Sequence, residues 1–440
     1  MLEKLFHLKD KNANVKTELI AGLTTFLAMA YILAVNPSIL GQSGMDTHSV
    51  FMATALSAGV ASILMGVLAN YPVALAPGMG VNALFTYTVV LGMGYSWQAA
   101  LASVFVSGVI FLAISVTGLR KLIINAIPKQ LKLAIGAGIG FFVAFVAFKN
   151  AGIIVADSAT GVALGNLTEP TVLLAIFGIL ITIALVVKKV PAAVFVGMVI
   201  TAVVGLVLGF AGFEGMPSLP SQLITTDFSM PTFGAFAQGL GELFADPFNA
   251  FVIIFSFLFV DFFDTAGTLV AVGNRCGLVN EEGELENVEK ALLSDAIGTV
   301  VGAAFGTSTV TSFVESTSGV EVGGRTGLTA CTSGVLFFLS VLISPIVLST
   351  ATSAVTAPAL VVVGMLMAQQ LGGVDWDDFI AAASGFVTVI IMILSYSIAN
   401  GIALGFITYS VAMAASGKAK KVSPIIWILD IIFVLYFAFI

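Results

Sequence analysis

Apolar runs of membrane-spanning length recur along almost the entire chain, and this feature limits the available folds more than any other. A helix needs about 20 apolar residues to cross the hydrocarbon core of a bilayer. Hydrophobic residues make up 59% of the 440 residues and charged residues only 9%, whereas a soluble domain carries about 25% charged residues. The sequence therefore predicts an all-α polytopic membrane protein with about fourteen spans, some of them short or interrupted.

Lysine and arginine occur almost only in segments that the alternation of spans places on one side of the membrane. Of the 17 such residues, Lys149 alone falls elsewhere. The others are Lys4, Lys9, Lys11, Lys16, Arg120, Lys121, Lys129, Lys132, Lys188, Lys189, Arg275, Lys290, Arg325, Lys418, Lys420 and Lys421. Basic residues concentrate in cytoplasmic loops, so we expect a multi-pass protein of the cell (plasma or inner) membrane with a cytoplasmic N-terminus. The net charge of −7 indicates no nucleic-acid partner.

Two acidic residues interrupt the apolar run Phe251–Arg275. A charged group at bilayer depth costs at least several kcal/mol, so such a run should exclude carboxylates. Asp261, Asp264 and Thr268 follow the spacing i, i+3, i+7, which puts them on one face of a helix. A polar stripe of this kind faces protein or water rather than lipid. A polar transport site is one explanation, and a structural hydrogen bond between neighbouring helices is the other.

Two segments too short to cross the membrane lie at matching positions in the two halves of the chain. Val73–Pro77 is bounded by prolines, and Thr307–Ser312 is polar and β-prone. Half a span follows each, with Asn82 and Glu315 near the two helix starts. Seven spans in the first half would invert the second half in the membrane. Short interrupted segments in inverted repeats are the strongest sequence indication of a transporter's central site, and broken backbone at that depth must line a cavity or be buried.

Asn82 and Glu315 also have simpler explanations. Ser312 and Glu315 have the spacing of a capping box, in which the glutamate only closes its own helix start. Asn82 fits either a substrate contact or a packing amide. Half-helix N-termini carry free N–H groups and partial positive charge, which would suit a nearby carboxylate or a substrate carbonyl.

The sequence suggests no cofactor and no metal. Its histidines, His7 and His48, and its cysteines, Cys276 and Cys331, lack the spacing of metal ligands. No nucleotide-binding loop occurs either. Transport would therefore be passive or driven by an ion gradient.

Four motifs together resemble those of one transporter family. They are TTFLAMAYILAVNP (24–37), APGMGVNALFTY (76–87), DFFDTAGTL (261–269) and SFVESTSGVEVGGRTGL (312–328). They are similar to the purine (adenine/guanine/hypoxanthine) permease branch of the nucleobase/ascorbate transporter superfamily. The resemblance covers essentially the whole chain. It implies two inverted repeats of seven spans, with two short strands meeting mid-membrane between a core and a gate domain.

The resemblance also implies a division of the chain. The core domain would comprise residues 17–119 and 247–349, and the gate domain residues 120–246 and 350–416. Residues 417–440 form a basic turn and an apolar tail that either spans the membrane or lies on it. The sequence leaves open whether the protein forms a homodimer.

The same resemblance implies uptake of purine bases with protons, through a core-domain site that includes Asn82, Asp261, Asp264 and Glu315. The residue types agree. A carboxylate can accept a hydrogen bond from N1–H of hypoxanthine or guanine, whereas adenine would need a protonated carboxyl or the Asn82 amide. Since burial favours the protonated form of a carboxyl group, Asp261 or Glu315 is expected to carry the coupled proton. Asp264 and another acid would hold the base.

Three other functions remain open from the sequence. An anion transporter on the same architecture would have to accommodate acids that repel its substrate. An intramembrane enzyme acting on lipid head groups would also need clustered acids, usually with a metal. A passive channel is not excluded by the broken helices.

Overall fold

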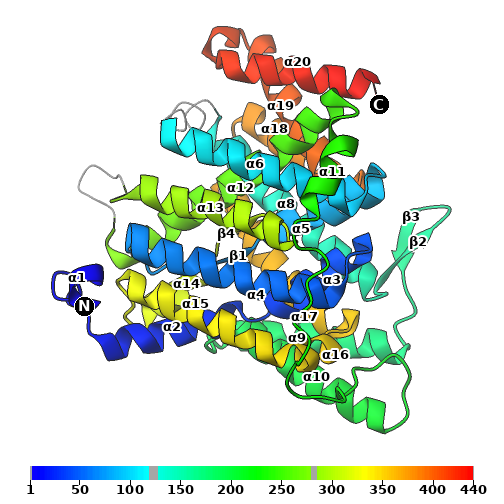
Figure 1. Cartoon of the computed structure of the whole chain (residues 1–440). Helices are drawn as coiled ribbons and strands as arrows, with labels where there is room; N and C mark the ends of the chain where they lie inside the picture. Colours follow the sequence, from blue (N-terminus) through cyan, green and yellow to red (C-terminus); the bar gives the residue numbers. More distant parts are fainter. Residues whose placement is uncertain (1, 118–126, 279–284, 440) are drawn as a thin grey trace.

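The computed structural model describes residues 2–117, 127–278 and 285–439. Arg120 and Lys121, which contribute to the predicted orientation, lie outside these ranges. The described part of the chain contains 10 helices that are long and apolar enough to cross a membrane. Most of these helices lie side by side and run between the end that carries the N-terminus and the opposite end (Figure 1). The prediction of an all-α polytopic protein is confirmed.

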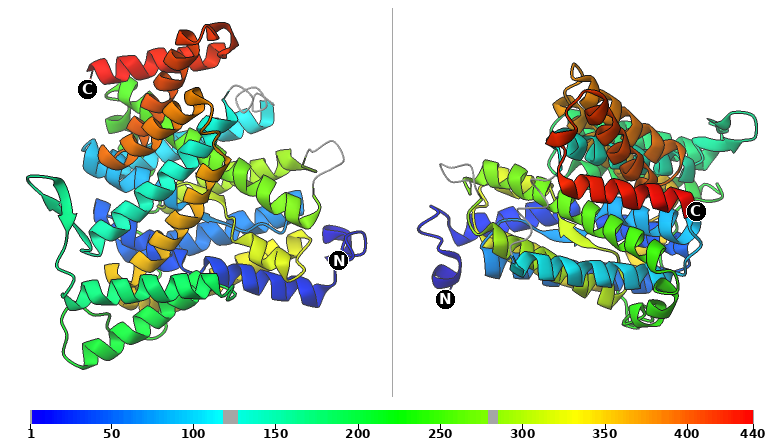
Figure 2. Two further views of the ribbon diagram at one scale, coloured as in Figure 1. Left: turned by 180° about the vertical axis from the view of Figure 1, so that it is seen from behind. Right: turned by 90° about the horizontal axis from the view of Figure 1, so that it is seen from above.

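The helices form two groups by packing. The first group contains α2 (Val15–Met29), α3 (Ile32–Leu40), α4 (Thr47–Leu64), α5 (Met79–Ala83), α6 (Trp97–Thr117), α11 (Phe236–Leu243), α12 (Pro247–Cys276), α13 (Val288–Phe305), α14 (Ser316–Glu321), α15 (Gly327–Ser340) and α16 (Ser344–Thr350). The second group contains α8 (Lys129–Asn150), α9 (Pro170–Val187), α10 (Ala193–Phe210), α17 (Ser353–Ala368), α18 (Phe379–Leu394) and α19 (Ile398–Ala415). Figure 2 shows both groups from two further sides.

Two short strands meet in the middle of the first group. β1 (Leu75–Pro77) and β4 (Val310–Ser312) pair antiparallel, with Ala76 opposite Thr311, and both are buried. They fall inside the segments 73–77 and 307–312, as the sequence predicted. Each strand leads into a short helix, α5 or α14, and the two strand–helix units run in opposite directions, as inverted repeats require. The strand pairing satisfies backbone groups that could not otherwise lie at this depth.

A second pair of strands, a β-hairpin, lies at the end of the molecule opposite the N-terminus (Figure 1). β2 (Ile154–Asp157) pairs with β3 (Gly161–Leu164) in the segment between α8 and α9. Its turn is held by Asp157, whose carboxylate accepts hydrogen bonds from Ala159 and Thr160. These bonds, first of all the backbone bond from Thr160, lower the pKa of the Asp157 carboxyl. The hairpin therefore marks one of the two membrane sides of the protein.

The C-terminal stretch forms helix α20 (Pro424–Phe439). It packs along α19 and α12 and runs away from the end that carries the N-terminus (Figures 1 and 2). The Phe433 ring lies 6.0 Å from that of Phe255 on α12 and 5.9 Å from that of Phe406 on α19. This helix therefore joins the two groups through aromatic contacts.

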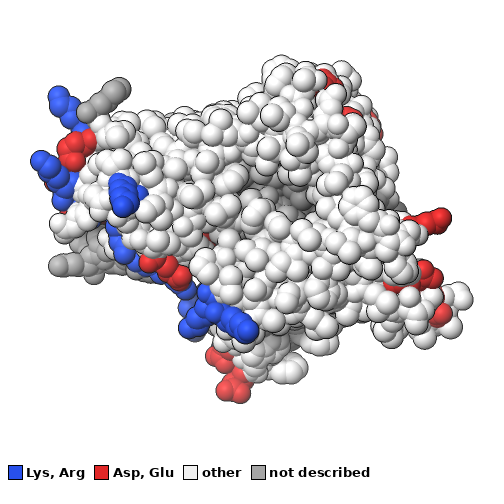
Figure 3. Space-filling model, turned by 90° about the horizontal axis from the view of Figure 1, so that it is seen from below, with Lys and Arg blue, Asp and Glu red and all other residues white. Residues whose placement is uncertain are grey.

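Charge is distributed unequally between the two ends. Lys and Arg side chains gather toward the end that carries the N-terminus, whereas the opposite end shows Asp and Glu (Figure 3). Arg275, at the C-terminal end of α12, forms an ion pair with Glu321 at the end of α14 (2.6 Å). This asymmetry follows the pattern of basic residues in the sequence.

Candidate functional site

The candidate site lies where α12 passes the strand pair and the start of α14. Asp264 comes from α12, and Glu315 is the residue that precedes α14. Both side chains are partly exposed, and they lie close enough for their carboxyl groups to interact electrostatically. A Cβ atom built on Gly78, at the start of α5, would lie 3.6 Å from Asp264 Oδ2. The structure thus brings two of the predicted acids together beside both interrupted helices.

Glu315 does not form the capping box considered above. Its side chain makes no capping bond to α14. Glu315 Oε1 instead accepts a hydrogen bond from the hydroxyl of Tyr31, at a distance of 2.5 Å. The capping-box interpretation is therefore wrong, because a donor far away in the sequence occupies the carboxylate.

Tyr31 is a site residue that the sequence analysis missed. It lies at the break between α2 and α3 and is only 1% exposed. The signal in the sequence was a single phenol hydroxyl inside the apolar motif at 24–37. Periodicity alone does not separate such a residue from an ordinary core tyrosine.

Asp261 and Asn82, the other two predicted site residues, are fully buried. Asp261 Oδ2 accepts a hydrogen bond from Thr299 of α13 (3.1 Å). Asn82 Oδ1 accepts one from Ser308. Among the described residues, Asn82 Nδ2 has no hydrogen-bond partner. The structure therefore places both side chains behind or beside the strands rather than in the exposed part of the site.

A buried acid of α13, Asp295, was also missed. Its carboxylate accepts hydrogen bonds from Thr265 (2.7 Å) and Ser312 (3.2 Å), and its side chain is 0% exposed. It lies in the stretch KALLSDAIGTV (290–300), in the middle of α13, as a single acid without a second acidic residue at helical spacing that would mark a site. Asp295 fixes β4 to α12 and α13, so it supports the site from behind.

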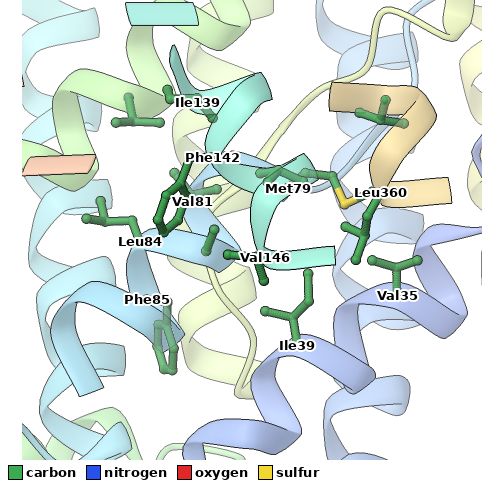
Figure 4. Close-up of a cluster of buried hydrophobic side chains, with 14 of the residues drawn as sticks. Val35, Ile39, Met79, Val81, Leu84, Phe85, Ile139, Phe142, Val146 and Leu360 are labelled. Atoms are coloured by element: carbon green, nitrogen blue, oxygen red, sulfur yellow. The ribbon is translucent and has the colours of Figure 1, made fainter. Parts of the chain in front are cut away.

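Apolar packing closes the site on the side of the β2–β3 hairpin. Figure 4 shows side chains of α3, α5, the π-helical segment Leu84–Gly92, α8 and α17 pointing toward one another. They include Val35, Ile39, Met79, Val81, Leu84, Phe85, Ile139, Phe142, Val146 and Leu360. Above this layer, Tyr87 accepts a hydrogen bond from Asn150 Nδ2 (2.9 Å) and packs against the ring of Phe142. A recess of about 290 Å³ beyond it is lined by residues that include Asn150, Thr171 and Ser353.

The two acids are not enclosed by this apolar packing. Val314, next to Glu315, is 45% exposed, and Glu315 and Asp264 are partly exposed.

Comparison with known proteins gives a consistent assignment. Residues 16–404 match the model of the Permease family. The guanine/hypoxanthine permease PbuG of Bacillus subtilis is 49% identical over the full length of both chains. The adenine permease AdeP of Escherichia coli is 42% identical over 100% of this chain and 96% of its own.

Solved structures with lower sequence identity share the fold. The transmembrane domain of the cyanobacterial bicarbonate transporter BicA has a TM-score of 0.62 at 18% identity, covering 89% of this chain and 97% of that one. The structure of SLC26A9 has a TM-score of 0.64 at 10% identity, covering 94% of this chain and 68% of that one. The chain therefore belongs to the permease family and, within the nucleobase/ascorbate transporter superfamily, to the purine permease branch.

Proposed function

We propose that the protein imports a purine nucleobase, either hypoxanthine, guanine or adenine, by proton symport across the cell membrane. The observation that carries this proposal is the pair of partly exposed carboxyl groups, Asp264 and Glu315, beside the two interrupted helices. The names of the most similar relatives support a purine as substrate.

The two acids would share the work of binding. A neutral, flat base offers N–H donors on its edge, and a carboxylate accepts them in a charge-assisted bond. Asp264 and Glu315 would hold the base in their charged forms. Buried Asp261 would bind the coupled proton, because burial favours the protonated form of a carboxyl group. The amide Nδ2 of Asn82 would donate a hydrogen bond to an acceptor atom of the substrate.

Transport would proceed by alternating access. The first helix group would act as the core domain and the second as the gate domain, and the apolar layer in Figure 4 would separate when the site opens to the outside. The basic end would be cytoplasmic, and a state in which the apolar layer is packed would have its outer side closed.

Uptake of radiolabelled hypoxanthine into proteoliposomes tests the proposal. With the external solution one pH unit more acidic than the lumen, we expect hypoxanthine to accumulate to about ten times its external concentration, because this gradient is worth about 1.4 kcal/mol for each proton carried with the base. Unlabelled guanine or adenine should compete, whereas uracil and sulfate should not. Uptake that ignores the gradient would contradict symport.

An anion transporter on the same architecture is the second candidate, since the solved structures with this fold include a bicarbonate transporter. The carboxylates of Asp264 and Glu315 would repel an anionic substrate. Competition by sulfate, with none by purines, would favour this alternative.

Asn150→Ala should loosen the closed side of the transporter. The substitution removes the hydrogen bond to Tyr87, which is worth about 1 kcal/mol, or about a fivefold change in the opening equilibrium. A single cysteine at buried Ile39, with Cys276 and Cys331 replaced by serine, should then react about fivefold faster with a membrane-impermeant thiol reagent added outside whole cells.

The matched control for this experiment is Asn166→Ala. Asn166 lies in the loop after the β2–β3 hairpin and bonds only within that loop in the described part of the chain. It should leave the labelling rate unchanged. Equal rates in the wild type and in Asn150→Ala would show that this hydrogen bond does not hold the outer side closed.

A further inference from the structure

Tyr31 contributes a third polar group to the site from an element that carries none of the acids. Its hydroxyl donates to Glu315 Oε1 at 2.5 Å, and its ring is 1% exposed. It lies at the break between α2 and α3, where the helix axis is interrupted at Ala30 and Tyr31. The inference below rests on the proposed purine transport and deepens it.

The pair of side chains is held by backbone packing on both sides. α14 lies directly on α2, because a Cβ atom on Gly319 would fall 2.2 Å from Thr25 Oγ1 and 2.7 Å from the carbonyl oxygen of Ala21. The backbone of Ala74 also donates to Ser316 Oγ at the start of α14 (3.0 Å). Tyr31 and Glu315 are thus carried by elements that contact each other closely, so neither can move far without the other.

The hydrogen bond fixes which role Glu315 plays. A phenol has a single proton to donate, and here that proton points at one oxygen of the carboxylate. A donor of this kind stabilises the charged, accepting form of the acid. The backbone N–H of Glu315 also donates to this carboxyl group, and an N–H group of the substrate would be a further donor to it. Glu315 and Asp264 are the charged groups that act on Tyr31 in the described part of the chain.

We propose that Tyr31 is a positioning residue that keeps Glu315 a hydrogen-bond acceptor, and that it thereby makes the site prefer bases with an N1–H donor over adenine. Hypoxanthine and guanine present a donor at N1, which matches an accepting carboxylate. Adenine presents an acceptor at N1, so it can form this hydrogen bond only when Glu315 carries a proton. Selectivity between these bases would therefore depend on a residue that need not touch the base.

Tyr31→Phe tests this role in the full chain in proteoliposomes. We expect the KM for hypoxanthine to rise about tenfold, the effect of losing a bond to a charged group, while kcat changes less than twofold. The inhibition constant of adenine, divided by that of guanine, should fall about tenfold. The pH optimum for hypoxanthine uptake should move to higher pH, because without the donor Glu315 needs less acid to become protonated. A purely structural role would move neither selectivity nor the pH profile.

Two comparisons keep the result interpretable. Tyr409→Phe removes a phenol hydroxyl from α19 in the second helix group and should change none of these values. Incorporation of 3-fluorotyrosine at position 31 keeps the ring and the donor, so it should restore the KM even if Tyr31→Phe lowers the folded yield. Wild-type protein that transports no purine would overturn both proposals. Wild-type protein that transports hypoxanthine, with the KM, selectivity and pH profile retained in Tyr31→Phe, would overturn the role of Tyr31 alone.

Discussion

Asp264→Asn and Glu315→Gln should each reduce hypoxanthine uptake by about 100-fold or more. Each substitution replaces a carboxylate that accepts on both oxygens with an amide that accepts on only one atom. A substrate N–H would lose a charge-assisted bond worth about 1.5–3 kcal/mol and would in part meet another donor. Because every 1.4 kcal/mol corresponds to a factor of about ten, the loss reaches about two orders of magnitude.

The measurement is initial-rate uptake, normalised to the amount of folded transporter from size-exclusion chromatography. The matched control is Glu214→Gln, which neutralises an exposed acid in the loop between α10 and α11 and should leave uptake unchanged. Either site variant with uptake within twofold of the wild type would remove the central element of the proposed binding site.

The chain of apolar runs was sufficient to predict the membrane fold, because helices and closed barrels are the only backbone forms that satisfy their own hydrogen bonds in lipid. The same argument located the two strands, since short proline-bounded or polar segments cannot remain helical at that depth. In each strand, only three residues take part in the pairing. The ladder is extended at its ends by bonds from Gly78 to Thr309 and from Phe313 to Ala74, so the predicted segments were longer than the strands themselves.

Partners of the acids could not be predicted from sequence, because side-chain bonds here join residues far apart along the chain. Tyr31 and Glu315 are separated by 284 positions, and no periodicity connects them. The local pattern instead suggested a capping box for Glu315, which the tertiary bond replaces. Asp261 and Asp264 share a helix face but not an environment. Asp261 is fully buried against Thr299, while Asp264 is partly exposed. Helical spacing predicted their common face and could not predict that difference.

The second large effect is expected for a substitution where two helices pack closely through glycine residues. α15 begins at Gly327, and its backbone lies directly on Gly66 in the π-helical turn Met65–Ala69. A Cβ atom on Gly327 would fall 2.0 Å from the carbonyl oxygen of Gly66. The reverse contact is also tight, because a Cβ atom on Gly66 would lie 2.3 Å from the carbonyl oxygen of Gly327. Both obstacles are backbone atoms, so no side-chain rotation relieves them, and small residues are what permit such close approach in membrane helices.

Gly327→Ala should therefore destabilise the protein although it adds one methyl group. To fit that group, α15 would have to move away from the π-helical turn and stretch the bond from its N–H to Asn70 Oδ1, now 2.8 Å. Overpacking of this kind costs about 1–3 kcal/mol, and strain at the helix start adds to it. For a chain of this size, each kcal/mol shifts the melting temperature by about 1 °C, so we expect the melting temperature in detergent to fall by about 3 °C.

Gly241→Ala separates the effect of crowding from that of glycine itself. Gly241 lies in α11, and a Cβ atom there would have no neighbour within 4 Å. Alanine favours a helix over glycine by about 1 kcal/mol, so this variant should melt at the wild-type temperature or slightly above it. If Gly327→Ala also melted within about 1 °C of the wild type, the tight crossing of α15 over Gly66 would not be a feature of the folded protein, because overpacking of about 1–3 kcal/mol would have to appear in the melting curve.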